Sequence, residues 1–344
     1  MNLKNQKILI TGHTGFVGSW LYLYLKQKKI NVYGIGLKPK NKGSIFKILK
    51  LDKDKNSKIL NILDYKKLKN HIKKIKPNII IHLAAQSLVL KSFNSPNHTI
   101  NTNVIGTLNI LNLVKELDNI ETVVFFTTDK VYRNDNKKKK FSENDALGGD
   151  DPYSASKSAS EIIINSFYKS YLKQKKIIIL RAGNIIGGGD ISDFRIIPDI
   201  VKAIKQKKTL NVRNLNSTRP WQHIMDTIGI ILKILKKINK KKVYKIYNIS
   251  PNSKTVPVNY IIKEFKKNFN FNSIIKKNKN IEKKFLELNS NKIFKELKLK
   301  NFYSSKASIN RVISFYNNSL KKKKSLKELM NSEFKDYEKL SKNN

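Results

Sequence analysis

A tyrosine and a lysine stand four residues apart in the segment Tyr153-Ser154-Ala155-Ser156-Lys157. On a helix this spacing places both side chains on one face. A lysine ammonium stabilises a neighbouring phenolate and so lowers a tyrosine pKa that starts at about 10. Such a tyrosine can remove a proton from an alcohol while a hydride leaves the same carbon. The spacing also arises by chance on exposed helices, so its meaning depends on the surrounding elements.

A second group of reactive side chains is the segment Thr127-Thr128-Asp129-Lys130, which closes an apolar run beginning at residue 122. In open α/β sheets, ligands bind at the carboxyl ends of the strands. A carboxyl and an amine at such an end offer an acid and a base. A surface ion pair is the alternative interpretation, and such pairs contribute little stability.

A glycine-rich turn, Thr11-Gly12-His13-Thr14-Gly15-Phe16-Val17-Gly18, joins a predicted strand to a predicted helix. Gly12 permits a tight turn, Gly15 lets the backbone approach a pyrophosphate, and Gly18 lets helix and strand pack closely. The free amides at the helix N-terminus attract an anion. This placement predicts a dinucleotide site, with a packing turn that binds no ligand as the alternative.

The end of the second predicted strand does not distinguish NAD from NADP. An acid usually holds the ribose hydroxyls there, but this chain reads Gly34-Ile35-Gly36-Leu37-Lys38. Lys38 would favour a 2′-phosphate, so both cofactors remain open.

Alternating elements position these groups. Apolar runs predict strands at residues 7–11, 31–37, 78–83, 122–127 and 176–181, and helical spacing predicts helices at 16–28, 65–76, 96–117 and 153–172. This alternation predicts a Rossmann-type, doubly wound parallel α/β sheet. We expect an NAD(P)-binding domain over residues 1–183, with a returning strand near 243–250. Residues 184–242 and 251–344 should form a smaller C-terminal α/β substrate-binding lobe.

Composition narrows the class of protein. The 344 residues carry a formal charge of +45, but only six of the 70 basic residues are arginines, and the lysines are scattered. Nucleic-acid-binding faces cluster their charge, so we predict no nucleic-acid partner. The absence of cysteine excludes disulfides and a catalytic thiol, and five histidines without ligand spacing predict no metal site. With no long apolar run and no signal peptide, we expect a cytoplasmic protein without a membrane partner.

The motifs together resemble the extended short-chain dehydrogenase/reductases that act on nucleotide sugars. Within that group the sequence resembles the CDP-glucose 4,6-dehydratases, over most of the chain to about residue 225. The segments that carry this closer resemblance are Gly12-His13-Thr14-Gly15-Phe16, Gly18-Ser19-Trp20-Leu21, Thr128-Asp129-Lys130 with Tyr132, Gly148-Gly149-Asp150-Asp151-Pro152-Tyr153-Ser154, Arg181-Ala182-Gly183-Asn184, Gly187-Gly188-Gly189-Asp190 and Arg219-Pro220-Trp221-Gln222-His223. Lys130 is informative, because dTDP- and GDP-sugar dehydratases have glutamate at this position.

The resemblance implies roles for individual residues. The implied catalytic residues are Thr128, Asp129, Lys130, Tyr153 and Lys157. The implied cofactor contacts are Gly12, Thr14, Gly15, Phe16, Val17, Gly18, Asn61, Ile62, Leu83, Ala84, Ala85, Gln86, Asn103, Tyr153 and Lys157. The implied substrate contacts are Gln86, Ser87, Asn184, Arg195, Arg219 and His223. Asn61 departs from an aspartate usual in the family, but an asparagine can still hydrogen-bond adenine.

The resemblance also implies a reaction, in which CDP-D-glucose becomes CDP-4-keto-6-deoxy-D-glucose. Tyr153 would take the C4 hydroxyl proton as hydride moves to NAD, Asp129 would protonate the departing C6 hydroxyl, and Lys130, if neutral, would remove the C5 proton. Hydride would then return to C6, which leaves no net change in the cofactor. Because the net reaction is the loss of water, the enzyme would be a carbon–oxygen lyase. The alternatives are another nucleotide-sugar 4,6-dehydratase, a 4-epimerase of the same family, or an inactive Rossmann regulator. A homodimer and a pathway to deoxysugars of O-antigen or lipopolysaccharide are further implications.

Overall fold

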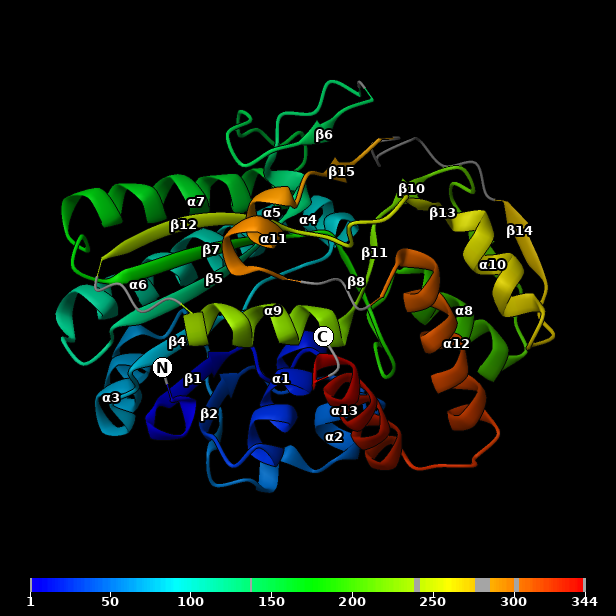
Figure 1. Ribbon diagram of the computed structural model, residues 1–344, viewed down its shortest axis with the longest axis horizontal. Coiled ribbons are helices and arrows are strands. Elements are labelled where there is room, and N and C mark those ends of the chain that lie inside the picture. The colour runs from blue at the N-terminus through cyan, green and yellow to red at the C-terminus, as the bar shows by residue number, and fades with distance from the viewer. Residues whose placement is uncertain (1, 137, 238–241, 276–284, 300–302, 343–344) are drawn as a thin grey trace. The chain divides into compact units, whose positions relative to one another are not determined.

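The computed structural model describes residues 2–136, 138–237, 242–275, 285–299 and 303–342 (Figure 1). The chain forms two compact units. Unit 1 comprises Met1–Arg133, Glu143–Ala182 and Ile231–Tyr247, and unit 2 comprises Asn134–Ser142, Gly183–Ile230 and Asn248–Asn344.

Unit 1 contains a seven-stranded sheet with the strand order β12-β7-β5-β4-β1-β2-β3. The strands are β1 Lys7–Thr11, β2 Asn31–Gly36, β3 Ser57–Ile59, β4 Ile79–His82, β5 Thr122–Thr128, β7 Lys176–Ala182 and β12 Val243–Ile249. Every pairing from β3 across to β7 is parallel. Strands β1, β2, β4, β5 and β7 consist mostly of buried residues, which fits a sheet covered on both faces. The predicted doubly wound α/β fold is confirmed.

Helices cover this sheet. They are α1 Phe16–Gln27, α2 Ile45–Ile48, α3 Tyr65–Ile75, α4 Val89–Asn94, α5 Pro96–Ile100, α6 Gly106–Glu116 and α7 Pro152–Ser170. Leu68 of α3, Ile110 of α6 and Ile164 of α7 share one buried cluster with Leu9 and Phe125 of the strands. Helices α3, α6 and α7 therefore pack on the same face of the sheet (Figure 1).

The helix predicted over 96–117 is interrupted. Between α5 and α6 the residues Asn101–Ile105 form a π-helical turn. The backbone carbonyl of Asn103 accepts hydrogen bonds from Thr107 Oγ1 at 2.6 Å and Ser160 Oγ at 2.9 Å. Side-chain hydroxyls thus compete with backbone amides for this carbonyl, which is a recognised cause of such a bulge.

Strand β3 was not predicted. Its three residues Ser57–Ile59 carry no apolar run, and two of them are exposed. The strand exists because it pairs with the edge of β2, where Gly34 lies opposite Ser57. Pairing of this kind is decided by tertiary contacts and leaves little trace in local sequence.

Unit 2 combines short strands with several helices. Its strands are β6 Lys140–Phe141, β8 Asn184–Ile186, β9 Leu210–Val212, β10 Thr218–Arg219, β11 Trp221–His223, β13 Val256–Pro257, β14 Ser273–Ile275 and β15 Glu287–Leu288. They pair two by two, as β8 with β11, β10 with β13, β9 with β14 and β6 with β15. The helices are α8 Ile196–Gln206, α10 Val258–Lys266, α11 Asn291–Leu297, α12 Ser305–Leu320 and α13 Leu326–Lys342, and α9 Ile224–Lys237 begins in this unit.

Among the helices that the structure describes, none combines the length and the apolar character needed to span a membrane.

Candidate active site

The carboxyl end of β5 carries a linked acid and base. Asp129 is almost fully buried, and its Oδ1 accepts hydrogen bonds from Thr128 Oγ1 at 3.0 Å and Lys130 Nζ at 3.1 Å. Asp129 Oδ2 is buried and has no hydrogen-bond partner in the described part of the chain. Lys130 is partly exposed. The pair can therefore exchange a proton internally while one carboxyl oxygen remains available.

Helix α7 begins where its capping residues dictate. Asp151 is the N-cap, its Oδ1 accepts the Ser154 amide at 2.9 Å, and Pro152 occupies the first helical position. Both are preferred at a helix start, because the cap satisfies a free amide and proline has none to satisfy. Gly149 precedes them with φ of +142°, and a Cβ there would lie 2.4 Å from the amide nitrogen of Ala155. Tyr153 follows on the first turn and is buried.

Lys157 lies one turn beyond Tyr153 on the same helix face. Its Nζ donates to the carbonyl oxygen of Phe126 at 3.0 Å. Burial lowers the pKa of Lys157 to about 8, against the opposing effect of Glu161 one further turn along. At neutral pH the side chain is thus an ammonium held in a poorly solvated position, as stabilisation of a phenolate requires.

We expect Lys157→Met to raise the free energy of unfolding at pH 7 by about 1 to 3 kcal/mol. The lowered pKa means that the folded protein pays for a poorly solvated ammonium, and methionine removes this cost. The net gain is smaller than the full cost, because the variant also loses the hydrogen bond from Lys157 to Phe126 O. Because the folded pKa is about 8 and the ordinary value is 10.5, the unfolded chain binds more protons between these values, and wild-type stability rises with pH. The gain in the free energy of unfolding of Lys157→Met over wild type should be largest below pH 8 and should vanish near pH 10.5.

Urea unfolding of wild type and Lys157→Met at pH 7 and at pH 10.5 measures this effect. Lys66→Met, which changes an exposed lysine of α3, serves as the control and should change stability by less than about 0.5 kcal/mol. A Lys157→Met variant less stable than wild type at pH 7 would contradict the assignment of a penalised ammonium.

Asn103 joins the cofactor side of the site to α7. Its Oδ1 accepts the Gln86 amide at 2.8 Å, and its Nδ2 donates to Gln86 O at 3.1 Å and to Ser156 Oγ at 2.8 Å. Ser156 lies between Tyr153 and Lys157 in the chain. The Gln86 side chain is also occupied, since Nε2 donates to Thr99 Oγ1 at 2.9 Å. Ser87, by contrast, is exposed.

The glycine-rich turn has the shape of a phosphate cradle. Gly12 adopts φ of +78°, and a Cβ on it would lie 2.7 Å from the amide nitrogen of Ala84. A Cβ on Gly18 would lie 2.2 Å from the carbonyl oxygen of Gly12. Gly15 caps α1 without any side-chain hydrogen bond. The first amides of α1, from Phe16 and Val17 onward, lack intrahelical partners and suit a pyrophosphate.

The remaining implied cofactor contacts lie in unit 1 as well. Leu83, Ala84 and Ala85 follow β4, with the Leu83 amide bonded to Thr11 O at 3.0 Å. Asn61 is exposed, and its Oδ1 accepts the Leu63 amide at 3.0 Å. Ile62 is buried against Gly106. A Cβ added to Gly106 would lie 2.4 Å from Cδ1 of Ile62. Thr14 lies beside Gly36, whose added Cβ would be 2.8 Å from Thr14 Oγ1.

His13 fills the place beside the end of β2, a role that the sequence did not reveal. Its ring occupies the space that a side chain at Gly34 would need, with Cδ2 at 2.3 Å from an added Cβ. Nε2 lies 2.7 Å from Ser57 Oγ of β3. Burial lowers the pKa of His13 to about 4, so that the ring is neutral at pH 7. His13 thus connects the glycine-rich turn to the edge of the sheet.

A buried ion pair supports the end of β5 and was also missed. Arg181 and Glu161 are each about 2% exposed, and Arg181 Nη2 lies 2.6 Å from Glu161 Oε2. Thr127 Oγ1 donates to Glu161 Oε1 at 2.6 Å, and Arg181 Nη1 donates to the Tyr132 hydroxyl at 2.8 Å. The spacing of Glu161, four residues after Lys157 on a helix, was the available signal.

Four implied substrate contacts lie in unit 2, and Asn184 and Arg219 are the two implied at the diphosphate. Asn184 begins β8 opposite Trp221 of β11, and its Oδ1 is buried with no hydrogen-bond partner in the described ranges. Arg219 is buried, and its Nη1 donates to Thr218 O at 2.7 Å. Arg195 Nη1 lies 3.2 Å from Asp190 Oδ2. His223 is also buried.

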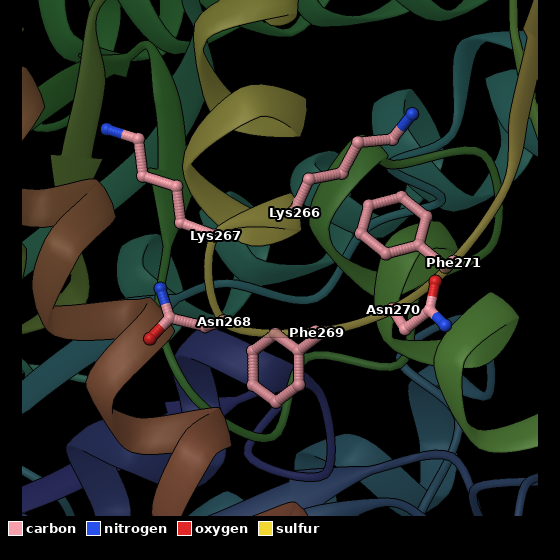
Figure 2. Close-up of a pocket in the computed structure, with 6 residues that line it drawn as sticks. All are labelled: Lys266, Lys267, Asn268, Phe269, Asn270 and Phe271. Carbon is pink, nitrogen blue, oxygen red and sulfur yellow. The ribbon is translucent and has the colours of Figure 1, made fainter.

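The five implied catalytic residues, Thr128, Asp129, Lys130, Tyr153 and Lys157, therefore all belong to unit 1, as does the glycine-rich turn. A hollow of about 510 Å³ in unit 2 is a different feature, lined by the consecutive residues from Lys266 to Phe271 (Figure 2). None of the implied site residues lines it. In the described part of the chain, no three His, Asp or Glu residues are grouped as a metal site would require.

Comparison with known proteins shows the family to which the chain belongs. A family model described as GDP-mannose 4,6 dehydratase matches residues 9–309. A CDP-glucose 4,6-dehydratase from Salmonella typhimurium is 39% identical over 233 residues, which cover 66% of this chain and 65% of that enzyme. A dTDP-D-glucose 4,6-dehydratase from Dictyostelium discoideum is 32% identical, over 71% of this chain and 58% of that protein. The chain thus spans somewhat less than two thirds of the length of these relatives.

Solved structures share the fold. A dTDP-glucose 4,6-dehydratase from Bacillus anthracis, solved in complex with NAD, superposes with a TM-score of 0.76 at 24% identity and covers 91% of this chain and 97% of that one. A UDP-glucose 4-epimerase from Thermotoga maritima, solved with UDP-glucose, gives a TM-score of 0.78 at 19% identity over 91% and 99% of the two chains. The α/β architecture is therefore one that several nucleotide-sugar enzymes use.

Proposed function

Since the chain belongs to the GDP-mannose 4,6 dehydratase family, we propose that it is a CDP-glucose 4,6-dehydratase. It would convert CDP-D-glucose to CDP-4-keto-6-deoxy-D-glucose and water. The Salmonella relative that carries this activity in its name supports the choice of nucleotide. Lys130 supports it too, because the resemblance associates lysine at this position with the CDP-glucose enzymes.

The observation that carries the proposal is the Asp129–Lys130 pair at the end of β5. Lys130 Nζ lies 3.1 Å from Asp129 Oδ1, so one proton transfer between them yields a carboxylic acid and a neutral amine. These are the two forms that elimination of water needs, an acid for the C6 hydroxyl and a base for the C5 hydrogen. A 4-epimerase breaks no C–O bond at C6 and needs no such pair.

Tyr153 and Lys157 would open the reaction. The Lys157 ammonium stabilises the Tyr153 phenolate, which takes the C4 hydroxyl proton. NAD held by the glycine-rich turn would supply the reversible hydride transfer that oxidation at C4 and reduction at C6 require. The C4 ketone acidifies the C5 hydrogen, which Lys130 removes while Asp129 gives its proton to the departing hydroxyl. Lys130 then returns a proton to C5, and solvent carries the Tyr153 proton back to Asp129, which restores every group.

We propose NAD as the cofactor. The cradle formed by Gly12, Gly15 and Gly18 fits a pyrophosphate, because added Cβ atoms at Gly12 and Gly18 would collide with backbone. The similar dehydratases from Bacillus anthracis and Streptomyces venezuelae were solved with NAD. Titration with NAD and NADP in parallel tests the choice, and tighter binding of NADP would reverse it.

On the substrate side, we propose that Arg219 and Asn184 bind the diphosphate, with Arg195, Gln86 and Ser87 as further contacts. A guanidinium suits a diphosphate because it offers paired donors and a permanent charge. The unpartnered Asn184 Oδ1 supports a ligand contact at that residue.

A panel of CDP-, dTDP-, GDP- and UDP-hexoses, each supplied with NAD, tests the function. We expect turnover of CDP-glucose with the highest kcat/KM and a product that shows the absorbance of a 4-keto sugar in alkali. Interconversion of C4 epimers without that absorbance would identify an epimerase instead. A protein that binds cofactor but turns over no sugar would contradict catalysis altogether.

Lys130→Met should abolish proton exchange at C5 while preserving oxidation at C4. In heavy water the wild-type product should carry solvent deuterium at C5, and the variant should incorporate it about 10²-fold more slowly or not at all. Mass spectrometry of the product measures the label, and Lys138→Met, a change in an exposed lysine of unit 2, is the control. Deuterium entering C5 at the wild-type rate would eliminate Lys130 as the base.

We further propose a cytoplasmic homodimer that supplies deoxysugars for O-antigen or lipopolysaccharide. Support for a dimer comes from apolar side chains on the helical surface of unit 1, where Ile100, Ile105 and Ile162 are 44%, 41% and 59% exposed. Light scattering of the purified chain measures the mass, and a monomer at all concentrations would refute the dimer.

A further inference from the structure

A cluster of charged side chains and rings, of which Glu333, His223 and Tyr303 are buried, lies in unit 2, apart from every catalytic residue proposed above. Arg311 of α12 donates from Nε to Glu333 Oε2 of α13 at 3.0 Å and from Nη2 to Asp336 Oδ2 at 2.9 Å. His223 Nε2 lies 3.6 Å from the same Glu333 oxygen. The Tyr303 ring stands between them, with its centroid 5.2 Å from that of His223 and 5.0 Å from Arg311 Cζ. We call these five residues the C-terminal ionic cluster.

Within this cluster the imidazole has a defined state. His223 is 2% exposed, and its Nδ1 accepts the Met225 amide at 3.3 Å. A neutral ring therefore carries its proton on Nε2, which faces Glu333. Burial, and then the charge of Arg311, lower the pKa of His223 to about 3. Arg311 thus supplies the positive charge for Glu333, and both ring nitrogens of His223 face protein groups.

The strand that ends at His223 adjoins both elements that carry the proposed diphosphate contacts, since Asn184 begins its partner β8, and Arg219 ends β10, which only Pro220 separates from β11. Strand β11 pairs with β8 so that Trp221 lies opposite Asn184 and His223 opposite Ile186. Arg219 lies two residues before Trp221. A shift of β11 along its axis would therefore move Arg219, which precedes it in the chain. The same shift would change the position of Asn184 relative to β11.

Helix α12 supports the neighbouring strand as well. It packs against both β8 and β11. The turn after β8 fits closely on it, because a Cβ on Gly188 would lie 2.2 Å from Phe315 Cε1. The Gly189 amide donates to the Tyr316 hydroxyl at 3.1 Å. One helix thus holds both strands of this small sheet, and the ion pair of Arg311 with Glu333 joins that helix to α13.

We propose that Arg311 and Glu333 are positioning residues that act through His223 to hold β11, and with it Arg219 and Asn184, in the register that receives a nucleoside diphosphate. His223 accordingly orients the strand instead of touching the substrate. The inference rests on the proposed function, since it takes a nucleotide-sugar diphosphate as the ligand. Displacement of a binding group by about 1 Å can reduce a rate about 10²-fold, so a small change in register has a measurable effect.

Glu333→Gln in the full chain tests the proposal, because glutamine keeps the size and removes the charge that Arg311 and His223 face. We expect KM for CDP-glucose to rise about tenfold, kcat to change less than about threefold, and affinity for NAD to stay unchanged. Calorimetric titration with CDP alone should show the same tenfold loss. The matched control is Asp336→Asn, which alters the other, 46% exposed partner of Arg311 and should change KM less than twofold.

A purely structural role would show a different pattern. Lower thermal stability with unchanged KM and unchanged CDP affinity would overturn the proposal, as would equal losses in the Glu333→Gln and Asp336→Asn variants. If Glu333→Gln does not fold, Arg311→Lys replaces it, since lysine keeps the charge and loses the two-nitrogen geometry. For this variant we again expect a rise in KM alone. An unchanged KM would overturn the proposal.

The CDP titration separates this inference from the proposed function. Wild-type protein that binds CDP but turns over no CDP-hexose would contradict the dehydratase, while the loss of CDP affinity in Glu333→Gln would still support the positioning pair. Wild-type protein that binds no nucleoside diphosphate would overturn both.

Discussion

Tyr153→Phe should lower kcat for CDP-glucose by about 10²- to 10⁴-fold, with affinity for NAD and the fold retained. Phenylalanine keeps the buried ring of Tyr153 and removes only the hydroxyl that takes the C4 proton. The Lys157 ammonium one turn away then has no phenolate to stabilise. Because the lost group acts on the first chemical step, kcat and kcat/KM should fall together.

Steady-state kinetics with CDP-glucose and titration with NAD measure both quantities. Tyr171→Phe is the matched control, since this tyrosine lies at the far end of α7 and is 49% exposed. It should retain activity within about twofold. Full activity in the Tyr153 variant would assign the C4 proton to another group and remove the main support for the proposed chemistry.

The second large effect concerns stability. Glu161→Gln should lower the free energy of unfolding by about 3 to 5 kcal/mol, because it leaves the Arg181 guanidinium buried without its counter-charge. Burial by itself would lower the pKa of Arg181, but the hydrogen bonds and charge of Glu161 raise it above its ordinary value. A guanidinium is not deprotonated in proteins, so Arg181 keeps its proton in the variant even without Glu161, and its charge remains uncompensated at any pH in the working range.

Urea denaturation followed by circular dichroism measures the loss. Glu116→Gln is the control, because this carboxylate is 37% exposed beside Lys69 and should contribute no more than about 1 kcal/mol. The double variant Arg181→Met with Glu161→Met should recover much of the stability, since apolar side chains of similar volume often replace a buried pair without loss. A Glu161 variant as stable as wild type would show that water solvates this arginine.

The same pair also bears on the site. Thr127 Oγ1 donates to Glu161 Oε1 at 2.6 Å, directly before Thr128 and Asp129 in the chain. Helix α7 thus carries Tyr153, Lys157 and Glu161 on successive turns of one face, with the last of them fixed to the strand that holds the acid and base. The distance between the two catalytic groups depends on this buried link.

Short-range patterns made much of this molecule predictable. Four-residue spacing predicted the shared helix face of Tyr153 and Lys157. The glycine-rich turn was recognisable from its spacing, and at Gly12 and Gly18 the backbone leaves no room for a Cβ. The alternation of apolar runs with helical spacing predicted the parallel sheet, while the order of its strands came from the structure.

What only the tertiary structure decided were pairings between distant residues. Strand β3 has no apolar run and exists through the edge of β2. The links of Arg181 to Glu161 and of His223 to Glu333 join residues 20 and 110 positions apart. Local sequence determines backbone preference and the face on which a side chain lies. Which buried charges meet depends on how elements pack, and that is set by contacts whose partners no short segment contains.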